Sequence, residues 1–293
     1  NTFSLFAQAD SELHPLFRPW VGLRYDAFSG DYENNDPGVD PATQDMNDYS
    51  QLSPKIGFVS PIHEMVDIRA SYTQGFELPS DVLKYNSAAG DTVTTVHQYE
   101  AGLRFEPGDF LTTEVAFFLI DTEDEIQEYP SGSGLYVNLG ETRRKGMELA
   151  ATFRPDVPGL EFFADLTTIT SEITSNPDAT VVGKEVTGVP EYTSNLGCRY
   201  KDASGFSGRI KWRHVGSYFV DGANTITYDG YDVADASLGY EGMTKGGNTW
   251  KINLDIDNLL DEHYSQAVWS GYDTTNYAVS PGRTFWLRLS LDI

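Results

Sequence analysis

The sequence predicts an all-β protein whose antiparallel strands cross a lipid bilayer, and three observations carry this prediction. Apolar and polar residues alternate with a period of two through most of the 293 residues. Many alternating segments reach the ~9–11 residues that a tilted strand needs to cross a bilayer. Short turns and long loops also alternate between the segments, as in an up-and-down transmembrane barrel with its long loops at one rim.

Composition agrees with this fold class and excludes others. The net charge of −24 repels nucleic-acid phosphates, so we expect no nucleic-acid partner. The single cysteine, Cys198, excludes an intrachain disulfide framework. No run of eighteen apolar residues is present, so no transmembrane helix is expected.

Alternation defines each expected strand in turn. In the fourth segment Val66, Ile68 and Ala70 alternate with Asp67 and Arg69. The same pattern, which places each set on its own face of a strand, recurs thirteen times. In chain order the expected strands are 3–11, 19–28, 49–59, 65–76, 97–105, 110–122, 136–154, 160–173, 190–201, 206–217, 230–240, 248–259 and 283–293.

The connections and the facing follow from the same pattern. Short turns, such as 106–109, 154–159 and 202–205, are expected in the periplasm, and long loops, such as 29–48 and 260–282, outside the cell. The polar rows are too highly charged for a packed core and fit a wet lumen. We expect lipid contact for Phe285, Leu287, Leu289 and Ile252, and an inward orientation for Arg288, Arg209, Lys251 and Glu100.

An odd number of strands has a further implication. Bacterial single-chain barrels have even strand numbers, so that both ends return to the periplasm. We therefore expect residues 1–293 to be the C-terminal portion of a larger barrel, with earlier strands missing before Asn1. The final strand, 283–293, then closes against a strand outside this chain.

Four groups of residues form recognisable motifs. They are Asn258-Leu259-Leu260-Asp261 with Tyr264, Pro281-Gly282-Arg283 before the last strand, Gly75-Phe76-Glu77-Leu78-Pro79, and Asn138-Leu139-Gly140 followed by Gly146-Met147-Glu148-Leu149. Together they resemble the motifs of one family, the TonB-dependent outer-membrane receptors. The resemblance covers the whole chain. Asn258 and Asp261 suit a turn, and Arg283 is placed to meet lipid-headgroup or rim carboxylate charge. The chain departs from the family by ending in Ile293 instead of an aromatic residue.

The resemblance implies a fold and a function. The fold is a 22-stranded barrel in the Gram-negative outer membrane, with a plug domain and a TonB-binding segment that this chain lacks. The function is active import of a scarce metal chelate, foremost a ferric siderophore, driven by TonB, with outer-membrane lipid and lipopolysaccharide as surroundings. Cobalamin, haem or oligosaccharide receptors of the same family remain alternatives, as does a passive porin or structural barrel.

Candidate ligand contacts lie in the long aromatic loops, because aromatic faces give a large contact area for flat or cationic chelates. The candidates are Trp269, Tyr272, Tyr277, Tyr264 and Phe219. No catalytic motif is present, and the five histidines are scattered without metal-site spacing, so we expect no enzyme, no cofactor and no metal site. Acidic residues gather in the loop 31–48 and at 123–128, but their spacing matches no calcium-loop template.

Overall fold

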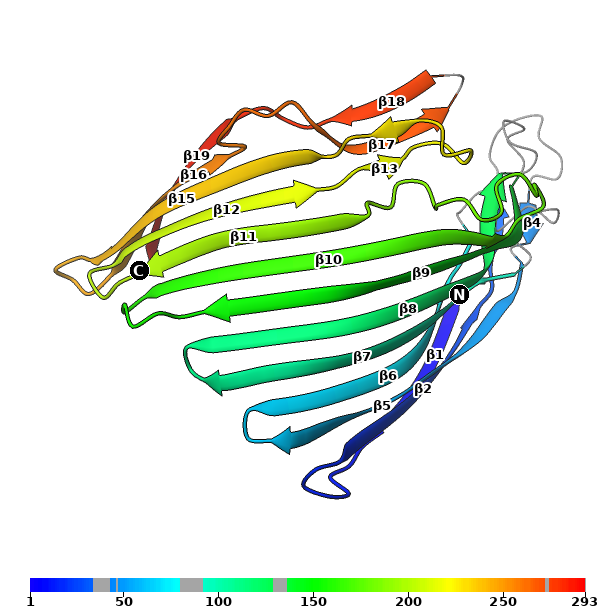
Figure 1. Ribbon diagram of the computed structural model, residues 1–293, viewed down its shortest axis with the longest axis horizontal. Coiled ribbons are helices and arrows are strands. Elements are labelled where there is room, and N and C mark those ends of the chain that lie inside the picture. The colour runs from blue at the N-terminus through cyan, green and yellow to red at the C-terminus, as the bar shows by residue number, and fades with distance from the viewer. Residues whose placement is uncertain (34–42, 46, 80–91, 129–135, 272–273, 293) are drawn as a thin grey trace. The chain divides into compact units, whose positions relative to one another are not determined.

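A computed structural model describes residues 1–33, 43–45, 47–79, 92–128, 136–271 and 274–292. Its main element is a 13-stranded sheet with the order β1-β2-β5-β6-β7-β8-β9-β10-β11-β12-β15-β16-β19 (Figure 1). The bounds are β1 Thr2–Asp10, β2 Arg18–Phe28, β5 Tyr49–His63, β6 Val66–Glu77, β7 Thr94–Gly108, β8 Leu111–Glu128, β9 Tyr136–Phe153, β10 Leu160–Ser175, β11 Tyr192–Lys201, β12 Phe206–Val215, β15 Tyr231–Met243, β16 Thr249–Asp257 and β19 Thr284–Asp292.

The thirteen predicted strands are confirmed in number and in order. Their ends differ by a few residues; β5, for example, continues to His63, where the prediction stopped at residue 59. Within the described residues β1 and β19 each have one neighbour in the sheet, so the expected open edge at β1 is present. No helix with the length and apolar character needed to cross a membrane occurs in the described residues.

Three long connections are not plain loops, and here the prediction was incomplete. Each contains a short two-stranded sheet of its own: β3–β4 (Asp31–Glu33 and Thr43–Asp45), β13–β14 (Tyr218–Phe219 and Thr227–Tyr228) and β17–β18 (Ser265–Gly271 and Thr274–Val279). Two-residue strands are too short to show a period in sequence, which explains why β13 and β14 were not foreseen.

Each sheet strand has an apolar and a polar face, because the side chains alternate along it. On one face of β16 and β19, Leu289 lies opposite Ile252 and Leu287 opposite Leu254. Leu287 and Leu289 are 64% and 72% exposed, which suits a surface that faces lipid.

Ion pairs between neighbouring strands occupy the polar face. Arg288 contacts Asp255 at 2.6 Å, and Lys251 contacts Glu241 at 3.4 Å. Arg69 likewise lies 3.3 Å from Glu100. Opposite charges across neighbouring strands stabilise a sheet modestly and fix its register. The separation of apolar from ionic rows therefore agrees with the expected facing.

Two compact units make up the chain. The first contains Asn1–Gly102, Phe117–Lys145 and Thr170–Val186, and the second contains Leu103–Ala116, Gly146–Ile169 and Thr187–Ile293. In the first unit, Asp26 is fully buried and accepts hydrogen bonds from Arg24 and from Ser4 Oγ at 2.6 Å, which ties β1 to β2. The second unit contains both of the sites described below.

Candidate functional site

Two hairpins, β13–β14 and β17–β18, pack together at the long-loop end of the second unit, and we call residues 218–228 and 265–279 the aromatic double hairpin. Figure 1 shows β13 and β17 beside one another. The backbone N–H of Ser270 donates to the carbonyl of Val220 at 3.0 Å, and the N–H of Ser265 donates to the Tyr228 hydroxyl at 3.0 Å. These bonds join residues that are 37 and 50 positions apart in sequence.

A small apolar core holds the double hairpin. Tyr218, Val220 and Val268 are buried together, and Tyr228 packs against them. The rings of Tyr218 and Tyr228 meet edge to face with centroids 5.3 Å apart, an arrangement that the quadrupoles of aromatic rings favour. Burial raises the pKa of the Tyr218 hydroxyl above its usual value.

Asp221 organises the turn of β13–β14. Its carboxylate accepts hydrogen bonds from the N–H of Ile226 at 2.7 Å, the N–H of Thr225 at 2.9 Å and the Thr225 hydroxyl at 2.8 Å. Burial, the largest single influence, acts to raise the pKa of Asp221, but these hydrogen bonds together outweigh it and lower the pKa. The turn is therefore held by an ionised carboxylate.

Of the five predicted ligand residues, Trp269, Tyr277 and Phe219 lie on the double hairpin. Trp269 and Tyr277 are 51% and 55% exposed, whereas Phe219 is half-buried. Tyr277 extends the aromatic row, with its ring 6.5 Å from that of Tyr228. The register pairs Tyr277 with Val268 and Trp269 with Asn276, so Trp269 and Tyr277 occupy opposite faces of β17–β18.

The other two predicted ligand residues are Tyr264 and Tyr272. Tyr264 is buried, and its ring lies 4.4 Å from that of Tyr231 at the start of β15, so it packs within the protein. Tyr272 falls outside the described residues.

Sequence reasoning missed a polar pair near the double hairpin. Asn195 on β11 and Arg213 on β12 are register partners on the polar face. In the described part of the chain, Asn195 Oδ1 and Arg213 Nε are both buried without a hydrogen-bond partner. The Arg213 guanidinium also lies over the Tyr231 ring, 5.7 Å from its centroid. Only the tertiary structure reveals such orphaned atoms, since alternation identifies the face but not the partners.

The Asn258 and Asp261 motif anchors the last loop to the sheet. Asn258 is buried with a left-handed φ of 53°, and its side chain donates to the carbonyl of Glu262 and accepts from the N–H of Glu262, both at 2.8 Å. Asp261 accepts from the N–H of Arg283 at 2.8 Å and pairs with its guanidinium at 3.8 Å. Arg283 thus meets a rim carboxylate, one of its two expected partners.

Metal ligands do not gather in the described ranges: no group of three or more His, Cys, Asp or Glu side chains there is placed to hold an ion. The double hairpin instead offers rigid aromatic surface and a few polar groups. That chemistry suits recognition of a compact organic ligand.

Comparison with known proteins gives the family. A family model described as TonB dependent receptor-like, beta-barrel, matches residues 1–259. The chain is 27% identical over 262 residues to the ferrichrome outer membrane transporter/phage receptor of Escherichia coli (strain K12), covering 86% of this chain and 33% of that protein. It is also 27% identical over 177 residues to the ferrioxamine B receptor of Salmonella typhimurium (strain SL1344), covering 58% of this chain and 24% of that one. The chain thus spans a third or less of these relatives.

Solved structures show the same fold. The siderophore receptor PiuA from Acinetobacter baumannii superimposes with a TM-score of 0.80 at 20% identity, over 98% of this chain and 42% of that one. The ferric yersiniabactin uptake receptor FyuA from Yersinia pestis gives a TM-score of 0.78 at 20% identity, over 100% and 45%. With a family model that matches 259 consecutive residues and a strand order that agrees with it, the chain belongs to the TonB-dependent receptors and forms part of their outer-membrane β-barrel.

Proposed function

We propose that the protein imports a ferric siderophore across the outer membrane, with energy supplied through TonB. The aromatic double hairpin would form part of its outer ligand-binding surface. The observation that carries the proposal is the exposed Tyr277 ring at the end of the packed Tyr218–Tyr228 row. A receptor for a dilute ligand gains affinity from such preorganised surface, because little conformational entropy is lost on binding.

The relatives support the cargo class. Two of them are a ferrichrome transporter and a ferrioxamine B receptor, and the structural neighbours include receptors for other siderophores. The unpartnered Arg213 Nε and Asn195 Oδ1 would supply one donor and one acceptor to a ligand that passes the double hairpin. TonB would act through a segment outside this chain, as the resemblance implies. Catalysis forms no part of the proposal.

Binding to the full-length protein that carries this chain tests the proposal. A panel of hydroxamate, catecholate and carboxylate ferric siderophores would be titrated in detergent, with cobalamin, haem and an oligosaccharide mixture beside them. We expect saturable binding of at least one siderophore. Binding of cobalamin, haem or a glycan alone would identify the other cargo class, and binding of no compound would favour a porin.

The two exposed aromatics allow a matched pair of variants. We expect Tyr277→Ala to weaken siderophore binding at least tenfold, or about 1.4 kcal/mol. Trp269→Ala removes an equally exposed ring from the opposite face of the same hairpin, so the two results show which face meets the ligand. Heat-modifiable gel mobility would establish that each variant assembles. Unchanged affinity in both assembled variants would remove this hairpin from the site.

A further inference from the structure

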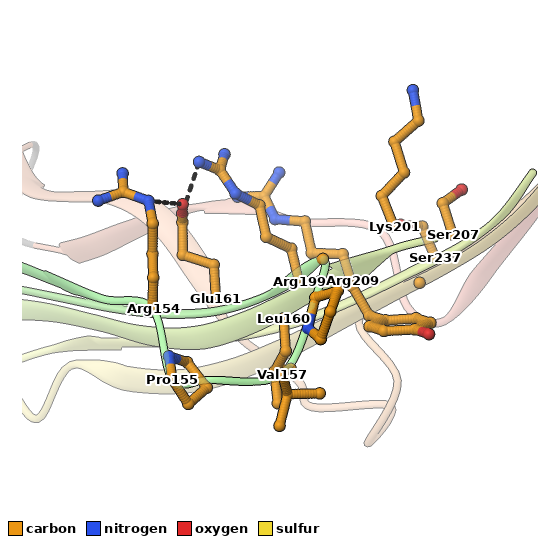
Figure 2. A pocket seen from close by; sticks show the side chains of 14 residues that line it. Arg154, Pro155, Val157, Leu160, Glu161, Arg199, Lys201, Ser207, Arg209 and Ser237 are labelled. Carbon is orange, nitrogen blue, oxygen red and sulfur yellow. Dashed lines mark ion pairs between the residues drawn. The ribbon is translucent and has the colours of Figure 1, made fainter. Parts of the chain in front are cut away.

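A basic pocket lies at the short-turn end of β10, β11 and β12, and the long connection that carries β13 and β14 begins at the other end of β12. Its volume is about 610 Å³, and its polar lining includes Arg154, Glu161, Arg199, Lys201, Arg209 and Ser237. Figure 2 shows Arg154, Glu161 and Lys201 on one side of the ribbon and Pro155 and Val157 on the other. The charged residues of the lining therefore lie together, on the side of the ribbon opposite Pro155 and Val157 (Figure 2).

Strand register brings the charges together. Glu161 on β10 is paired with Arg199 on β11, Arg199 with Arg209 on β12, and Arg209 with Ser237 on β15. Residues paired in this way share one face of a sheet. Like charges directly opposite one another destabilise a sheet, so the Arg199–Arg209 pair requires compensation by a negative group.

Glu161 compensates only part of this charge. It is 12% exposed and lies 3.0 Å from Arg154 Nε and 2.5 Å from a terminal nitrogen of Arg199 (dashed lines in Figure 2). Arg209 instead lies over the Phe163 ring, 5.4 Å from its centroid. Among the residues that the structure describes, neither Arg209 nor Lys201 forms an ion pair within 4.0 Å. Arg209 also lines a neighbouring pocket that contains Asp235, Asp255 and Asp257.

The resulting charge balance is unusual for this chain. Four cations and one carboxylate give the pocket a formal charge of +3, in a protein whose net charge is −24. Guanidinium groups are donors only, and their planar forks match the two oxygens of a carboxylate or phosphate. The Ser207 and Ser237 hydroxyls, which also line the pocket, add further donors. The pocket thus carries more positive charge and more donors than its one carboxylate, Glu161, can balance.

We propose that this pocket is an oxyanion-binding site that takes a carboxylate or a phosphate group. The group belongs either to a small soluble anion or to an acidic side chain of the same protein. The proposal is independent of the siderophore assignment, because it rests on different residues at the other end of the strands.

Two probes and a designed variant test it. Inorganic phosphate and citrate would be titrated into the full-length protein at low ionic strength by calorimetry. The variant Lys201→Gln with Arg209→Gln removes two cations and leaves both ion pairs of Glu161 intact. The matched control, Lys184→Gln with Lys245→Gln, removes two exposed cations from turns outside the pocket. We expect the pocket variant to weaken binding of the probe at least tenfold and the control to change it less than twofold.

A third variant introduces a negative charge into the pocket. Ser237→Asp puts a carboxylate directly opposite Arg209 while retaining every cation, so we expect it to abolish binding of phosphate and citrate. Loss of binding in this variant would place the bound probe beside Arg209, because the new carboxylate is the register partner of that residue.

The outcomes separate the two sources. Saturable phosphate or citrate binding that the pocket variant loses assigns the site to a soluble oxyanion. No probe binding, together with a lower midpoint of heat-modifiable mobility in the pocket variant than in the control, assigns it to an acidic side chain of the protein. No probe binding and equal midpoints, or probe binding that the pocket variant retains, would overturn the proposal.

Discussion

At the scale of single residues, two short polar side chains fix the long loops of the second unit. Asn258 adopts a left-handed φ of 53°, which asparagine tolerates better than most residues. Its amide joins the end of β16 to Glu262 at 2.8 Å, and to Pro281, just before β19, at 3.4 Å. Asp221 plays a comparable role within β13–β14. Both residues hold, through hydrogen bonds to the backbone, the connections that carry the aromatic surface.

Replacement of Asn258 tests the first device. We expect Asn258→Ala to lower the free energy of unfolding by about 1–3 kcal/mol, because buried partners lose their hydrogen bonds. Asn258→Gly permits the left-handed backbone but lacks the amide, so a similar loss in both variants assigns the effect to hydrogen bonding. The control, Asn248→Ala, changes a half-buried asparagine just after the turn between β15 and β16. The midpoint of heat-modifiable gel mobility measures each effect, and an unaltered midpoint in Asn258→Ala would contradict it.

The lowered pKa of Asp221 predicts a pH dependence. A carboxyl whose pKa is lower in the folded state stabilises that state above the unfolded pKa, about 3.9, and loses the effect as pH falls through the folded value. We expect hydrogen-exchange protection of residues 218–228, corrected for intrinsic rates, to fall below pH 4. Asp221→Asn should show reduced protection at pH 7 and little further loss in acid. Protection that is the same in both proteins at pH 7 would refute this role.

At the scale of elements, each sheet strand separates an apolar row from an ionic one. In β19 the row of Leu287 and Leu289 opposes that of Arg288 and Ser290, and Arg288 reaches Asp255 on β16. This separation stabilises the strand in a bilayer, because a charged side chain on the lipid side would lose its hydration. The double hairpin follows a different rule, because contacts between hairpins bury Val268 and Val220.

Substitutions at two neighbouring residues of β19 test which side of the strand faces lipid. We expect Leu289→Arg to reduce stability in lipid by about 2–4 kcal/mol if the residue lies near the bilayer midplane. Ser290→Arg introduces the same charge one position along, on the polar face, and should have an effect of less than about 1 kcal/mol. Urea titration of the full-length protein folded in lipid vesicles measures both. A larger loss in Ser290→Arg than in Leu289→Arg would reverse the assignment of the faces.

At the scale of the whole molecule, the chain is one part of an outer-membrane receptor barrel, with its described residues in two compact units. The second unit carries both the aromatic surface at the long-loop end and the basic pocket at the short-turn end. A receptor that imports its cargo requires a capture surface on one side of the membrane and a source of energy on the other. Under the proposed function, the residues of this chain supply only the capture surface.

Uptake in cells tests the energy source. We expect cells that produce the full-length protein to accumulate iron from the siderophore that it binds, and isogenic cells without TonB to lose most of this accumulation. Binding to the cell surface should be equal in both strains, because capture precedes energy-driven transport. Equal accumulation of radioactive iron with and without TonB would instead indicate passive passage.

The sequence by itself determined the thirteen strands of the main sheet, their order, their two faces and the family resemblance. These properties depend on the local alternation of apolar and polar residues, on turn residues such as Asn258 and Asp261, and on the lengths of the connections. All three can be read directly from the sequence. For the ligand candidates, the sequence identified the loops that contain them but not how their side chains are arranged in space. It grouped Trp269, Tyr277 and Tyr264 together because each is an aromatic residue in one long connection.

Only the tertiary structure decided what those residues do. It buries Tyr264 against Tyr231, places Trp269 and Tyr277 on opposite faces, and joins β13–β14 to β17–β18. It also aligns Glu161, Arg199 and Arg209 from three strands into one row. The physical reason is that register and packing between distant segments are set by pairwise contacts, which a period of two does not specify.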